Sequence, residues 1–368
     1  MATWQLRNHI PIAGPARREP ADGTESPMRV SLGFEPAWFH QRREVEFGER
    51  WHTDPRYRRD SLVVCKRELQ RAFPATDYWD ALSDADMWTL SGAYGAYPIA
   101  RLFGAELLYD ADRWPAPLRP VLTLDDVDRL DIDELLSNAF AADLHRQMDM
   151  IEKESGRIHG YLNWQGVLNN AFILVGQSIF TDMVERPELA HRFFDFISNL
   201  MIRLATMIQA RQTQSGFTVD HLSVSNCTIN MVSSRFYREF VFPYDQKIAE
   251  QFTRFGVHTC NWNATPYLQN IAQLPKVGYI DMGIETNLAQ AKSLFPEARR
   301  AVMYSPVKLQ DAPRDEIEND MRKIRDAIAP CDIVMADIQA TTPDSRVNEL
   351  LQICHTLEGS AQFDSRTG

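Results

Sequence analysis

The chain has 368 residues, of which 44% are hydrophobic and 24% charged, a composition typical of globular proteins and unlike that of disordered or fibrous ones. Its 50 acidic and 39 basic side chains give a net charge of −11, which argues against nonspecific binding to nucleic acid or anionic membranes. The longest apolar runs are far shorter than the roughly 20 residues of a membrane helix, and no leader sequence is evident. We therefore expect a soluble, cytoplasmic protein.

The N-terminal residues 1–27 contain four prolines and two glycines among charged residues. This composition does not sustain a regular helix and predicts an extended N-terminal arm. Such arms often pack against a partner subunit. We expect one further domain, residues 28–360, which begins with a strand at 29–34 and continues with helices near 61–73, 98–104 and 123–127.

From about residue 139 the predicted elements alternate regularly. Strands are predicted at 158–163, 220–224, 256–260, 277–283, 300–304 and 332–337. Helices are predicted at 138–154, 174–184, 187–215, 234–255 with a break near Pro243, 266–274, 288–294, 315–328 and 344–357. This alternation favours an α/β fold, a closed TIM (β/α)8 barrel. An open doubly wound sheet is the alternative, although no GxGxxG sequence follows any predicted strand.

The sequence His258-Thr-Cys260 ends one of these strands. Residues two apart in a strand point to the same side, so both side chains are expected at the barrel mouth, where imidazole and thiolate are suitable zinc ligands. Alone, such a pair is more often structural, because buried cysteine commonly serves as a small apolar side chain. The polar and aromatic continuation Asn261-Trp-Asn263 favours a site. Candidates for the missing ligands are Asp337, Asp281, Glu285 and Cys227.

The five cysteines are scattered, without a CxxC pair or a disulfide-framework spacing. We expect mostly reduced thiols, and interpret three of them as core or surface residues: Cys65, Cys331 and Cys354.

From residue 158 to 357 the chain resembles the uroporphyrinogen decarboxylase superfamily. The resemblance rests on Phe236-Tyr-Arg-Glu-Phe-Val-Phe-Pro-Tyr244, Gly256-Val-His-Thr-Cys260, Gly278-Tyr-Ile-Asp-Met-Gly-Ile-Glu-Thr-Asn-Leu-Ala289 and Thr342-Pro-Asp-Ser-Arg-Val347. It implies a TIM barrel. The decarboxylase branch carries an arginine-rich Met-Arg-Gln-Ala-Gly-Arg-Tyr signature, where this chain has Met28-Arg-Val-Ser-Leu-Gly-Phe34. Porphyrinogen decarboxylation is therefore not expected.

The other branch is similar to zinc methyltransferases that move methyl groups between corrinoid proteins and thiols, and carries a His-X-Cys with a distant cysteine. His258 and Cys260 match the first two positions, and Asp337 stands at the third. The resemblance implies a metal site of His258, Cys260 and Asp337, with Glu285 as a further ligand or supporting catalytic group. A carboxylate is a harder ligand than thiolate, so iron or manganese becomes an alternative to zinc.

Five residues near predicted strand ends are expected to line the substrate pocket: Tyr161, Asn163, Trp164, Gln165 and Asn226. Alternatively, the aromatic side chains only pack and the amides cap helices. The expected activity is metal-dependent methyl transfer from a small-molecule or corrinoid-protein donor to a thiol or similar acceptor. No corrinoid-binding Asp-X-His-X-X-Gly sequence occurs, so any corrinoid is expected on a separate partner protein. The superfamily also implies a homodimer.

Two other functions remain open. One is a lyase or decarboxylase acting on a small carboxylate substrate, with His258 as general acid and an aspartate orienting it. The other is a non-catalytic subunit that docks a corrinoid protein through residues 38–59. In and beside that segment, a basic cluster either binds an acidic partner or forms a solvated helix face: Arg42, Arg43, Arg50, His52, Arg56, Arg58 and Arg59.

Overall fold

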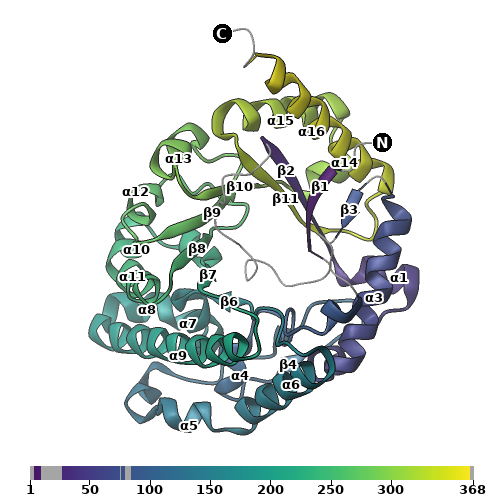
Figure 1. Ribbon diagram of the computed structural model, residues 1–368. Coiled ribbons are helices and arrows are strands. Elements are labelled where there is room, and N and C mark those ends of the chain that lie inside the picture. Colours follow the sequence, from purple (N-terminus) through teal and green to yellow (C-terminus); the bar gives the residue numbers. More distant parts are fainter. Residues whose placement is uncertain (1–3, 10–26, 75, 79–83, 365–368) are drawn as a thin grey trace.

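The computed structural model describes residues 4–9, 27–74, 76–78 and 84–364. These residues form an α/β barrel, as predicted, with the strands as an inner layer and the helices around them (Figure 1). The main sheet has nine strands in the order β3-β1-β2-β11-β10-β9-β8-β7-β6, and every neighbouring pair is parallel. Its strands are β1 Trp4–His9, β2 Met28–Phe34, β3 Thr76–Tyr78, β6 Trp164–Gln165, β7 His221–Ser225, β8 Arg254–His258, β9 Val277–Gly283, β10 Arg299–Met303 and β11 Cys331–Ile338.

The helices supply the outer layer and the connections between strands. They are α1 Pro36–Arg43, α2 Glu49–Thr53, α3 Pro55–Ala72, α4 Pro98–Leu102, α5 Ile132–Leu136, α6 Ala139–Ser155, α7 Val167–Val175, α8 Ser178–Glu185, α9 Pro187–Gln214, α10 Ser234–Phe240, α11 Phe242–Gln251, α12 Leu268–Ile271, α13 Leu288–Leu294, α14 Pro306–Asp311, α15 Arg314–Ile328 and α16 Asp344–Asp364. A two-stranded antiparallel ladder joins β4 Leu107–Leu108 to β5 Ala116–Pro117.

Part of the predicted N-terminal arm belongs to the sheet. Residues 4–9 form β1, which pairs with β2 and β3 in parallel. All four prolines of the arm lie at residue 11 or later, so this segment keeps every backbone N–H needed for a ladder. The rest of the predicted arm, residues 1–3 and 10–26, lies outside the described residues.

A glycine and a proline account for two local features of the fold. The predicted strand at 158–163 does not form: only His159 makes an isolated bridge, to Thr89, and β6 begins after this segment, at Trp164. Gly160 adopts φ +100, which a regular strand does not use, and a Cβ there would lie 2.1 Å from Thr89 Oγ1. The predicted break near Pro243 is confirmed, since α10 ends and α11 begins on either side of Val241.

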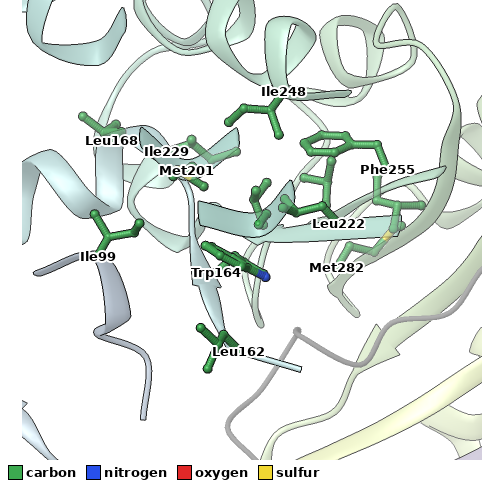
Figure 2. Close-up of a cluster of buried hydrophobic side chains, with 14 of the residues drawn as sticks. Ile99, Leu162, Trp164, Leu168, Met201, Leu222, Ile229, Ile248, Phe255 and Met282 are labelled. Carbon is green, nitrogen blue, oxygen red and sulfur yellow. The ribbon is translucent and has the colours of Figure 1, made fainter. Parts of the chain in front are cut away.

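The register of three strands positions the site. Ser225 of β7 pairs with His258 of β8, and His258 pairs with Asp281 of β9. The carboxyl ends of parallel strands meet at one edge of the sheet, so these three residues lie side by side at the barrel mouth. Around this part of the sheet, a cluster of buried apolar side chains includes Leu222 and Met282 (Figure 2). The strands that carry the site are therefore anchored in the hydrophobic core.

Among the described residues, no single helix is both long and apolar enough to cross a membrane; only α7 and α8 taken together, bent by 110°, pass on length and composition.

Candidate metal centre

Three side chains from two neighbouring strand ends converge at the barrel mouth. The sulfur atoms of Cys227 and Cys260 and a ring nitrogen of His258 all lie within 4.8 Å of one another. Cys227 begins the 3-10 turn Cys227–Met231 after β7, and His258 is the last residue of β8. Cys260 follows two residues later at φ +66, so it lies in a turn and not in the predicted strand. The turn brings its sulfur to the cluster.

A buried carboxylate fixes the orientation of His258. Asp281 Oδ2 lies 2.7 Å from His258 Nδ1, and Oδ1 accepts a 3.0 Å hydrogen bond from the backbone N–H of Thr259. Tyr279 also donates its hydroxyl to Asp281 Oδ2, at 3.0 Å. The carboxylate holds the Nδ1 proton, which leaves Nε2 as the nitrogen available to the cysteines.

The cluster is electrostatically polarised. A hydrogen bond from Cys260 lowers the pKa of Cys227 well below its ordinary value; burial opposes this effect and the charge of His258 adds to it. Burial opposes a charged His258, yet Asp281 and Cys227 outweigh it and raise the pKa of the imidazole. The hydrogen bond to Cys227, together with burial, raises the pKa of the Cys260 thiol. In the metal-free cluster these directions favour Cys227 over Cys260 as the thiolate.

These residues fit a thiophilic divalent ion. Two sulfurs and one imidazole nitrogen make three of the four ligands of a tetrahedral zinc site, and the fourth position would be open to a substrate. Metal-bound histidines generally donate their second N–H to a carboxylate, as His258 does to Asp281. The three ligand atoms and the Asp281 carboxylate that orients His258 therefore both suit zinc.

Asp337, the predicted third ligand, is not a member of this three-residue cluster; Cys227 is. Asp337 lies on β11, is exposed, and its carboxyl group interacts with that of Glu35, which follows β2. Burial and this neighbouring carboxyl raise the pKa of Glu35 to about 7. The β2 and β11 ends thus form a separate acidic pair. The predicted Glu285 is exposed in the loop after β9.

The five predicted pocket residues differ in burial. Trp164 is buried in the apolar cluster of Figure 2, which agrees with its packing alternative. The Tyr161 ring lies 5.5 Å from that of His221, at the start of β7. Gln165 accepts a 2.6 Å hydrogen bond from Asn169 Nδ2. The other two predicted residues, Asn163 and Asn226, are both buried.

Most of the basic cluster near the N-terminal helices is neutralised within the chain. Arg42 pairs with Asp344 and Arg43 with Glu68, at 2.7 and 2.6 Å. The Arg58 side chain is fully buried. The cluster therefore consists largely of internal ion pairs. Further pairs are Arg50–Asp54, Arg56–Glu154 and Arg59–Asp60.

Cys227 is one of the four further ligands considered from the sequence, although the predicted metal site did not include it. The register of β7 against β8 is what places it beside His258, and the loop sequence Ser225-Asn-Cys227 was the available signal. Asp245, a buried carboxyl group bonded to Asn226, was missed because it lies in the middle of a predicted helix.

Two solved structures and one family model match the chain. A methyltransferase from Methanosarcina mazei superimposes with a TM-score of 0.62 at 16% identity, over 93% of this chain and 95% of that one. A B12-independent methionine synthase from Shewanella sp. W3-18-1 gives a TM-score of 0.45 at 12% identity, over 94% and 100% of the two chains. No curated protein matches the sequence. The family model of uroporphyrinogen decarboxylase (URO-D) matches residues 94–357, more than half of the chain, so the protein belongs to the URO-D family.

Proposed function

We propose that this protein is a metal-dependent methyltransferase, with zinc held by Cys227, His258 and Cys260. The observation that carries the proposal is the convergence of these three side chains at the barrel mouth, with His258 oriented by Asp281. This set replaces the predicted one that contained Asp337. Two thiolates favour zinc over iron or manganese, because carboxylate ligands would suit those harder ions better.

The proposed reaction transfers a methyl group to a thiol. The bound ion would lower the pKa of the substrate thiol, so that it reacts as thiolate. A carbon–sulfur bond forms at the methyl carbon, and the donor atom leaves with the electron pair of the broken bond. The thiol proton is released to solvent. A cobalt corrinoid on a separate protein and a small methylated molecule are the two donor classes, and Glu285 is proposed to assist from the loop after β9.

The protein's own side chains orient and hold protons in this scheme. Asp281 keeps the proton on His258 Nδ1, which maintains Nε2 as a ligand. Exclusion of water around the cluster is favoured by the burial of His258 and Asp281, which are 6% and 0% exposed. For substrate contacts we retain Tyr161, Asn163 and Gln165 as the proposed set; of the other two predicted residues, Trp164 packs in the apolar cluster and Asn226 is fully buried and bonded to Asp245.

The test is thioether formation by zinc-loaded protein. Methylcobalamin, methylated amines and methylated thioethers would be offered with a panel of low-molecular-weight thiols, and products identified by mass spectrometry. We expect at least one pair to react, and the matched Cys260→Ser variant to lose that activity. Fully metal-loaded protein that forms no thioether with any pair would contradict methyl transfer.

The Asp281–His258 contact also supports a second candidate function. A carboxylate-oriented imidazolium is a suitable general acid, as a lyase or decarboxylase acting on a small carboxylate substrate requires. This alternative needs no metal. It predicts turnover that survives complete chelation, whereas the methyltransferase proposal predicts loss of activity on chelation and recovery with zinc.

A further inference from the structure

The turn that carries Cys227 is fixed by the preceding residue. Asn226 is fully buried, and its backbone N–H donates to the carbonyl oxygen of His258 at 2.8 Å. Its side-chain Nδ2 donates to Asp245 Oδ2 on α11 at 2.7 Å. Gly166 packs closely against the Asn226 side chain, since a Cβ at Gly166 would lie 1.8 Å from Asn226 Oδ1. Asn226 therefore links the turn to β8 and to α11.

Asp245 is an unusual residue for this position in the core. It is fully buried, and burial raises the pKa of its carboxyl group to about 7, although hydrogen bonds from Asn226 and Tyr237 oppose the shift. Tyr237 donates its hydroxyl to the same Oδ2, at 3.1 Å. In the described part of the chain, Asp245 Oδ1 has no hydrogen-bond partner. A buried, incompletely bonded carboxyl group is costly compared with an apolar residue of similar size.

We propose that Asp245 is a positioning residue for the metal centre: acting through Asn226, it holds the Cys227 turn against the end of β8. It does not touch the cluster itself. Without this contact, the side-chain nitrogen of Asn226 would have no acceptor among the described residues, and the turn would depend on the backbone hydrogen bond to His258. This inference rests on the proposed function for its metal-binding consequence, but the placement of Cys227 is a separate property.

Four variants separate positioning from general stability. Asp245→Leu removes the acceptor while filling the space, and Asp245→Asn retains a carbonyl oxygen that can accept from Asn226 and Tyr237. Gly166→Ala acts from another element, the start of α7, because the added methyl group would displace the Asn226 side chain. The matched control is Asp182→Asn, which alters another buried aspartate, one on α8 that accepts from Arg186 just after that helix.

Two measurements read the position of Cys227. In cobalt-loaded protein, the thiolate-to-cobalt charge-transfer absorbance reports how many thiolates bind. In metal-free protein, peptide mass spectrometry after iodoacetamide treatment gives the alkylation rate of Cys227 relative to Cys260. We expect Asp245→Leu and Gly166→Ala to lose the contribution of one thiolate, to bind the ion about 10- to 100-fold more weakly, and to change the alkylation ratio. Asp245→Asn and Asp182→Asn should retain wild-type values.

Wild-type absorbance and alkylation ratio in a folded Asp245→Leu variant would overturn the inference. If that variant does not fold, Gly166→Ala decides, and unchanged readouts there would overturn it equally. Wild-type protein that binds no cobalt would refute the metal centre, and the alkylation ratios would still show whether Asp245 positions Cys227.

Discussion

Replacing Asp281 with asparagine should impair the metal centre by changing the proton position on His258. The carboxylate oxygen 2.7 Å from Nδ1 requires a proton on that nitrogen. An amide can keep its oxygen toward the Thr259 N–H, which donates to Asp281 Oδ1 at 3.0 Å, and then presents its NH2 group to Nδ1. Nδ1 becomes an acceptor, and the proton moves to Nε2, where it blocks metal binding.

The expected loss follows from the hydrogen bond removed. A buried hydrogen bond to a charged group contributes about 1.5–3 kcal/mol, which corresponds to roughly a 10- to 100-fold weaker zinc affinity. The assay is competition with a chromophoric chelator, with unfolding measured in parallel. Tyr279→Phe is the matched control, because it removes one donor to the same oxygen but keeps the carboxylate. Unchanged zinc affinity in a folded Asp281→Asn protein would refute this account of how His258 is oriented.

Two further predictions concern carboxyl groups with a raised pKa. Since the folded-state pKa of Asp245 is about 7 against an ordinary 3.8, the native state binds more protons between these values, and wild-type stability should fall as pH rises through this window. The stability of Asp245→Asn relative to wild type should therefore increase by about 3 kcal/mol between pH 4 and pH 7 in urea unfolding, and a pH-independent difference would contradict a raised pKa. Asp337→Asn replaces the carboxyl group beside Glu35 with a neutral amide. The pKa of Glu35 should then fall from about 7 toward its ordinary value, with the part of the shift caused by burial remaining. A carbon NMR titration of Glu35 that shows no change would refute the coupling.

The barrel was predictable because its signals are local and repeated. The strand predicted at 277–283 matches β9, and the helix predicted at 288–294 matches α13. Residues 4–9 were assigned to the arm because prolines later in the segment dominated the composition, whereas pairing with β2 depends on partners distant in sequence. Local pattern cannot report such pairing.

The candidate site was only partly predictable for the same reason. His258 and Cys260 are neighbours in sequence, so their proximity follows from local geometry. Cys227 joins them through the register of β7 against β8, which a single sequence does not specify. Asp337 was favoured over Cys227 by resemblance to a family pattern, and the structure places its carboxyl group beside Glu35. The contact between Asp245 and Asn226 joins the turn to α11, a helix that begins 15 residues after Cys227, so a single sequence does not specify it either.

The central claim is that Cys227, His258 and Cys260 bind a metal ion. Metal content of purified, reconstituted protein, measured by mass spectrometry beside Cys227→Ser, Cys260→Ser and Asp337→Ala, tests it most directly. The account predicts about one equivalent of zinc in wild type and in Asp337→Ala, and a sharp fall in both cysteine variants. Full zinc content in Cys227→Ser with loss in Asp337→Ala would contradict the ligand set, and no metal in the wild type would contradict the metal centre itself.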